Sequence, residues 1–65
     1  MKTERYLMWS RKTWNYAVIS SQEVMRAMLI WGNPEGFDAA KRIVSAKQLT
    51  VLESKLSALG GTLSA

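Results

Sequence analysis

Two tryptophans, Trp9 and Trp14, flank the cations Arg11 and Lys12 in the stretch MWSRKTWNY. An aromatic ring can stack on a nucleic-acid base or fill a pocket on a protein, and a neighbouring cation can neutralise a phosphate or a carboxylate. These four side chains therefore suit binding to nucleic acid or to a protein. They also suit a simple turn between two strands, where solvated cations are common.

The residues that most catalytic and metal sites need are missing. The chain has no His and no Cys, which excludes histidine bases, thiolate nucleophiles, disulfides and the common zinc ligand sets. Glu35 and Asp38 come nearest to a paired-carboxylate site, but acids in the first turn of an expected helix are ordinary partners of the helix dipole. We therefore predict a protein that is not an enzyme and that uses no cofactor and no metal.

The chain is small and rich in apolar residues. A domain of 65 residues buries only about 60% of the surface of its unfolded chain, so its core is marginal. Yet 48% of the residues are hydrophobic, including three Trp and four Met, types that are enriched in interface cores. We expect part of this apolar surface to be exposed, for self-association or for docking on a larger partner.

Positive charge gathers near the start of the chain. The net charge is +4, and the first nineteen residues carry four cations (Lys2, Arg5, Arg11 and Lys12) against the single acid Glu4, a balance of +3. This distribution favours a partner with an acidic surface. The longest apolar run, AMLIW, is far shorter than a membrane-spanning helix needs, so we expect a cytoplasmic protein for which membrane binding is unlikely.

The first nineteen residues predict a two-stranded β-hairpin over about residues 5–19. The segments RYLMW and WNYAVI are aromatic and β-branched, and the polar SRKT between them suits a four-residue loop. The alternative is a helix over residues 4–16, which would make the protein an all-α bundle. Such a helix is also what binding to a membrane surface would require.

Three helices are expected to follow, each preceded by residues that commonly cap or begin a helix. They cover residues 21–31, 34–44 and 46–59, and a frayed tail occupies 60–65. The starting signals are Ser20 with Glu23, Asn33 with Pro34, and Ser45 with Gln48. The predicted fold is thus α+β, one small domain over residues 1–65, with the hairpin packed on three short helices.

The last expected helix carries a regular leucine pattern. Leu49, Leu52, Leu56 and Leu59 are spaced by three, four and three residues, which is the pattern of a helix-packing seam. Two heptads are too short for a free coiled coil. The seam therefore packs either within the domain or across a homodimer.

We expect a protein-binding module, a regulator or inhibitor, that docks on a larger protein or assembly through aromatic and methionine anchors with a basic rim. The expected partner is a protein with an acidic surface, such as one in a nucleic-acid-handling complex. Very small, basic, cysteine-free proteins are often regulators of this kind, many of them encoded by phages or mobile elements. The predicted contact residues are Met8, Trp9, Arg11, Lys12, Trp14, Tyr16, Arg26 and Trp31.

Nucleic-acid binding is the alternative function, and it has two forms. In one, Arg11 and Lys12 at the hairpin tip bind phosphates while a neighbouring tryptophan stacks on a base. In the other, the helices 21–31 and 34–44 form a helix-turn-helix that turns Lys41 and Arg42 toward DNA. The two acids near the start of the second helix disfavour this second form, because that end usually meets base edges and phosphates.

Overall fold

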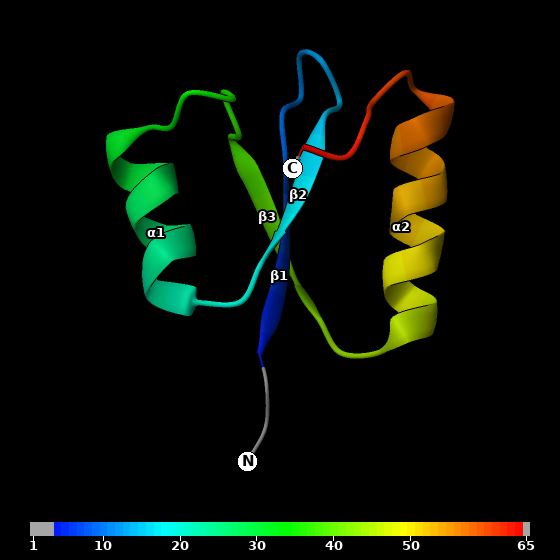
Figure 1. Ribbon diagram of the computed structural model, residues 1–65, viewed down its shortest axis with the longest axis horizontal. Helices are drawn as coiled ribbons and strands as arrows, with labels where there is room; N and C mark the ends of the chain where they lie inside the picture. The colour runs from blue at the N-terminus through cyan, green and yellow to red at the C-terminus, as the bar shows by residue number, and fades with distance from the viewer. Residues whose placement is uncertain (1–3, 65) are drawn as a thin grey trace.

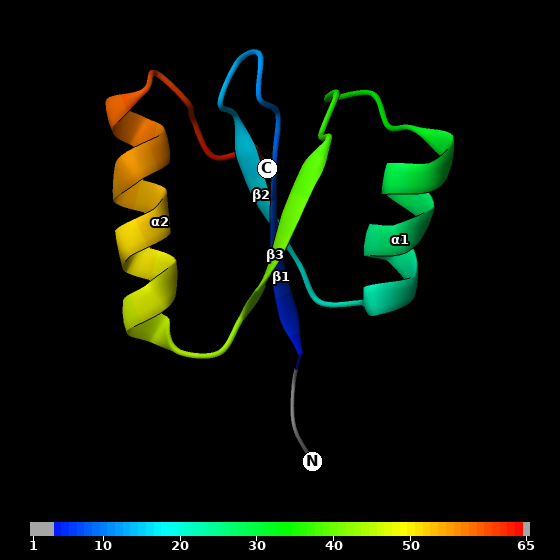
Figure 2. The same ribbon diagram turned by 180° about the vertical axis from the view of Figure 1, so that it is seen from behind.

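The structure is a computed structural model, in which residues 4–64 are described. Its five elements are β1 (Arg5–Trp9), β2 (Tyr16–Ile19), α1 (Gln22–Trp31), β3 (Ala39–Ile43) and α2 (Ala46–Ala58). The strands form one antiparallel sheet in the order β2-β1-β3, with α1 on one face and α2 on the other (Figures 1 and 2). The predicted α+β class is confirmed and the all-α alternative is wrong. The predictions that involve Lys2 and Ala65 fall outside the described residues.

The predicted hairpin is present as β1 and β2. The two strands pair from Tyr6 with Ile19 to Trp9 with Tyr16. The loop is longer than expected, six residues from 10 to 15, because Trp14 has a positive φ of 67° and so lies outside the strand conformation. The helix considered for residues 4–16 is wrong, so this segment lacks the helix that binding to a membrane surface was expected to require.

The helix predicted over residues 34–44 is wrong, and its second half is the strand β3. Gly36 has a φ of 77°, which no α-helix tolerates, and the Asn33 side chain holds the loop by accepting from the Phe37 N–H at 2.8 Å and donating to its carbonyl at 3.0 Å. The strand then pairs with β1 at five positions. Pairing with a distant strand has overridden the local helix preference of AAKR.

The two remaining helices are confirmed, with one change of cap. α1 is capped by Ser21, not Ser20: the Ser21 hydroxyl accepts a hydrogen bond from the Val24 N–H at 3.2 Å. α2 begins as predicted, because Ser45 accepts from the Gln48 N–H at 3.1 Å. Each cap satisfies one of the backbone donors left free at a helix start.

The segment expected to be a frayed tail is attached to the sheet. Tyr16 donates its N–H to the Thr62 carbonyl at 3.1 Å, and Ser64 donates its N–H to the Tyr16 carbonyl at 2.7 Å. Asn15 adds a side-chain acceptor for the Thr62 N–H at 3.0 Å. The tail therefore pairs with the outer edge of β2 at Tyr16, the first residue of that strand.

The central strand β1 explains how the core is built. A cluster of Leu7, Tyr16, Ile43 and Leu56 lies between the sheet and α2. Because side chains alternate along a strand, the buried neighbours Tyr6 and Met8 point to the opposite face, which α1 covers (Figure 1). Because a helix covers each face of the sheet, the middle residues of β1 are buried on both faces, which explains why they are apolar.

Candidate interaction surfaces

The hairpin tip is tightly held by its own hydrogen bonds. Ser10 is buried, and its hydroxyl accepts from the N–H groups of Lys12 at 3.2 Å and Thr13 at 3.4 Å. The Trp14 N–H donates to the Ser10 carbonyl at 2.8 Å, which closes the loop. The polar segment between Trp9 and Trp14, for which binding was predicted, therefore forms an ordered turn.

Arg11 is engaged by a carboxylate within the chain. Its N–H donates to Asp38 Oδ1 at 3.0 Å, and its guanidinium Nε lies 3.4 Å from Asp38 Oδ2. The backbone hydrogen bond from Arg11, aided by the guanidinium charge, lowers the pKa of Asp38 below its ordinary value. Of the two cations predicted at the tip, Arg11 thus joins the hairpin to the loop before β3, and Lys12 is exposed beside it.

Several predicted contact residues are part of the interior. Met8 is 0% exposed and Tyr16 is buried, so neither can anchor a partner on this structure. Trp9 and Trp14 are half-buried and pack against the core cluster. Met8 and Tyr16 are therefore structural residues, whereas Trp9 and Trp14 each keep part of their surface exposed.

The leucine seam is satisfied mainly within the domain. Leu56 belongs to the core cluster, and Leu49 and Leu52 pack against it. Leu59 remains more than half exposed beyond the end of α2. Of the two arrangements that the spacing allowed, packing inside the chain accounts for three of the four leucines.

The two remaining predicted contact residues, Arg26 and Trp31, lie on α1. None of the described residues of this helix is buried, and Trp31 is 83% exposed next to Ile30 at 71%. Val24 is also exposed, and the spacing of 24, 27 and 30–31 places these side chains and Ala27 in one line along the helix. We call Val24, Ala27, Ile30 and Trp31 the α1 stripe.

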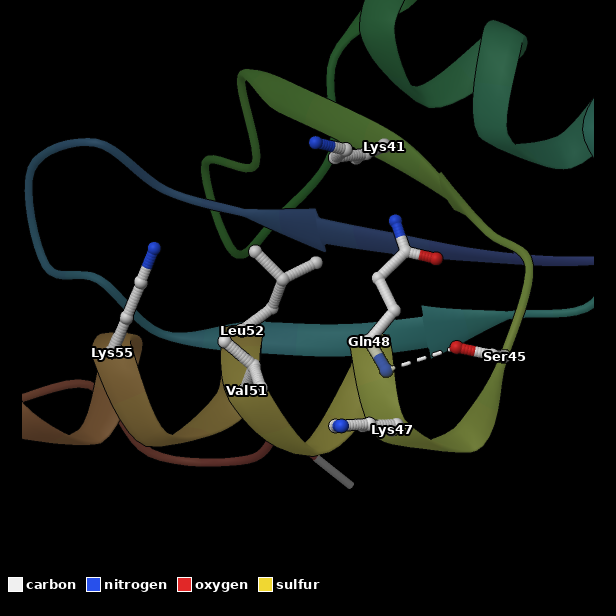
Figure 3. A pocket seen from close by; sticks show the side chains of 7 residues that line it. All are labelled: Lys41, Ser45, Lys47, Gln48, Val51, Leu52 and Lys55. Carbon is white, nitrogen blue, oxygen red and sulfur yellow. Dashed lines mark hydrogen bonds between the residues drawn. The ribbon is translucent and has the colours of Figure 1, made fainter.

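A second surface, a hollow between β3 and α2, was not among the predicted sites (Figure 3). It measures about 420 Å³, and its lining includes three lysines, Lys41, Lys47 and Lys55. We call it the lysine groove. The remaining lining residues are Ser45, Gln48, Val51 and Leu52. Lys41 was predicted to lie on a helix over residues 34–44, a position that gives no reason for it to lie near the lysines of α2.

The helix-turn-helix interpretation is wrong, because its second helix is absent from this position and Lys41 lies in a strand. Within residues 4–64, no three acidic side chains come together as metal ligands would, and no helix is both long and apolar enough to cross a bilayer.

Burial, together with the hydrogen bond that its hydroxyl donates to Glu4, raises the pKa of Tyr6. Tyr6 is therefore neutral at physiological pH.

Comparison with protein-family models, with curated proteins and with solved structures finds no match to this chain. Its function must therefore be inferred from its own residues.

Proposed function

We propose that this protein is a non-enzymatic binding module that docks on a larger protein through the α1 stripe. The observation that carries the proposal is the exposure of Trp31 beside Ile30 on α1. This helix covers one face of the sheet, yet none of the described residues of the helix itself is buried. Leaving a tryptophan and an isoleucine in water has a free-energy cost that burial in a partner would recover. Tryptophan is also the residue most typical of interface hot spots.

The form of the stripe favours a concave site on the partner. α1 has ten residues and is therefore about 15 Å long, and its apolar side chains follow the spacing with which a helix enters a groove. A pair of such short ridges from two copies would bury well under the roughly 800 Å² per partner of a standard interface. A groove can enclose the ridge and bury more of Trp31.

The charge of the chain favours an acidic partner. The net charge is +4, so two copies repel each other, whereas an acidic protein is attracted. At the stripe itself, the exposed Glu23 and Arg26 lie on the same helix and balance locally. Long-range attraction would therefore come from the whole chain, while the apolar stripe would supply the affinity.

Three chains test this proposal: the wild type, the double variant Ile30→Ser with Trp31→Ser, and the control Val44→Ser with Leu63→Ser. The control removes two apolar side chains of comparable exposure, 76% and 59%, away from α1. Each tagged chain is used to capture proteins from a lysate of the source cells. A protein that wild type and control retain and the α1 variant loses is then purified and titrated by calorimetry.

We expect the α1 variant to bind that protein at least about 30-fold more weakly, the loss of a hot spot of roughly 2 kcal/mol, with the control near wild type. Equal binding of all three chains would refute docking through α1. Light scattering of the wild type alone completes the test. If the wild type is a dimer and the α1 variant is a monomer, the α1 stripe binds a second copy of this chain. That result would refute docking on a larger protein.

A further inference from the structure

We propose that the lysine groove binds the phosphate backbone of a single-stranded nucleic acid. The groove and the α1 stripe lie on opposite sides of the sheet, so this site is separate from the proposed protein-docking surface (Figures 1 and 3). Lys41 reaches the groove from β3, and Lys47 and Lys55 reach it from α2. Two elements thus place lysines around one hollow.

No acid among the described residues compensates the positive charge of the groove. The ion pairs found within residues 4–64 join Asp38 to Arg11 and Glu4 to Arg42, and they leave all three groove lysines unpaired. Glu53, the acid of α2, lines a different hollow together with Tyr16. An anion is the ligand that such a cluster would stabilise.

The position of Lys47 strengthens this inference. It lies in the first turn of α2, where the positive end of the helix dipole disfavours a cation and where no acid is present to offset it. Helix stability alone would favour an acid there. A bound phosphate would instead benefit from both the lysine and the helix start.

The spacing of the cations fits a chain of phosphates better than one small anion. Lys47 and Lys55 are eight residues apart on α2, a rise of about 12 Å, and their side chains leave the helix about 80° apart around its axis. Successive phosphates of an extended strand lie several ångströms apart, so this distance spans more than one of them. A lysine ammonium is a compact charge that can donate hydrogen bonds to phosphate oxygens in many directions, which suits binding without sequence preference.

The frame around the groove is fixed by Gln48. Its side chain accepts from the Val44 N–H at 2.7 Å and donates to the Arg42 carbonyl at 3.2 Å, so it fastens α2 to the end of β3. The lysines of the helix are thereby held at a set distance from Lys41. Figure 3 shows Gln48 and Lys55 rising from α2 toward the strand that carries Lys41.

An apolar hollow beside the groove favours a single strand over a duplex. It measures about 140 Å³ and shares Leu52 and Lys55 with the groove, and its wall includes the half-buried Trp9. An unpaired base can leave its strand and rest against an aromatic ring there, while a duplex keeps its bases stacked inside. We infer that the lysines bind the phosphate backbone and that Trp9 stacks on a base.

The test uses a fluorescein-labelled dT20 strand, the matching rU20 strand and a 20-base-pair DNA duplex, titrated by anisotropy at several salt concentrations. The groove variant is Lys47→Gln with Lys55→Gln. Its control is Lys12→Gln with Arg26→Gln, which removes two exposed cations elsewhere. Both variants lower the formal charge by two, from +4 to +2, so they differ only in where the charge is lost. Circular dichroism verifies that both remain folded.

We expect the groove variant to bind the single strands at least about tenfold more weakly, and the slope of log K against log salt to fall by about 1.4, since each phosphate contact contributes about 0.7 in single strands. The control should lose no more than about threefold. A single Lys41→Gln chain should lose a smaller part of the affinity. Tryptophan quenching by unlabelled dT20 should persist in the α1 variant with Trp31→Ser and fall in Trp9→Phe.

Several outcomes would overturn the proposal. Absence of wild-type binding to either strand at low salt is one, and equal loss in both charge variants is another, because it would indicate a general effect of charge. Tighter binding of the duplex would exclude the single-strand assignment. Equal binding of heparin, of a poly-glutamate peptide or of vesicles with anionic lipid would reduce the groove to an unselective polyanion surface. Preference between dT20 and rU20 distinguishes DNA from RNA as the source of the strand.

Discussion

The two helices cover the same sheet in different ways. α2 contributes Leu56 to the core cluster and packs Leu49 and Leu52 against it, and Gln48 fastens its start to β3. α1 buries none of its described residues and leaves Trp31 and Ile30 largely in solvent. The two helices therefore differ in how far they bury their apolar side chains. Those of α2 complete the core, whereas α1 exposes apolar side chains that the fold does not bury.

The outer surfaces of the helices differ in chemistry as well. Beside α2, three lysines line a hollow whose lining holds no carboxylate among the described residues. Along α1 the exposed line is apolar and bordered by one acid and one base, Glu23 and Arg26. If both proposals hold, one small domain joins a nucleic-acid strand to a protein across a single sheet.

The largest expected difference between the helices is in stability. Leu56→Ala should lower the free energy of unfolding by about 2–5 kcal/mol, because it leaves a cavity in the core. Ile30→Ala on α1 should change it by no more than about 0.5 kcal/mol, since the side chain is exposed. Urea denaturation followed by circular dichroism measures both. Similar losses in the two variants would mean that α1 is as integral to the fold as α2.

Local signals in the sequence were sufficient for the hairpin and for both helices. Aromatic and β-branched residues identified β1 and β2, and Ser45 with Gln48 marked the start of α2. The strand β3 was missed because AAKRI prefers a helix locally, and its partner β1 lies some thirty residues earlier in the chain. Pairing at that distance leaves no mark in the segment itself.

The candidate surfaces were only partly predictable, for the same reason. Trp31 and Arg26 were expected at an interface, and both lie exposed on α1. Met8 was expected there too, but it lies in the central strand with a helix over each face, a position that only the three-stranded topology defines. The lysine groove needs Lys41 on a strand next to α2, so it followed from the fold and not from the sequence.

A smaller effect is expected from the helix caps, and it sharpens the comparison. Ser45→Ala removes the cap of α2, and Ser21→Ala removes that of α1. Each should destabilise its helix by about 1 kcal/mol. Because α2 holds the core, its loss should appear in the global free energy of unfolding. The loss in α1 should appear chiefly as faster amide hydrogen exchange along residues 22–31, with the global value little changed.

Hydrogen exchange at the α2 amides supplies the control for this pair. If Ser21→Ala speeds exchange equally in both helices, α1 unfolds only together with the core, and its loose attachment is refuted. Serine to threonine at the same positions should restore most of the protection, because threonine also caps a helix start.

The smallest expected effect concerns the link between the hairpin tip and the loop that follows α1. The pKa of Asp38 is lowered mainly by the backbone N–H of Arg11, so the folded chain holds this carboxylate ionised more strongly than the unfolded chain does. Its contribution to stability is therefore fully present above the unfolded value, about 3.9, and it is lost as the pH falls through the lowered folded value. Asp38→Asn should flatten that part of the stability curve and leave the curve above about pH 5 parallel to wild type. Thermal unfolding between pH 2 and pH 6 measures both curves, and an unchanged acid limb in the variant would mean that the Arg11 contact does not stabilise the fold in solution.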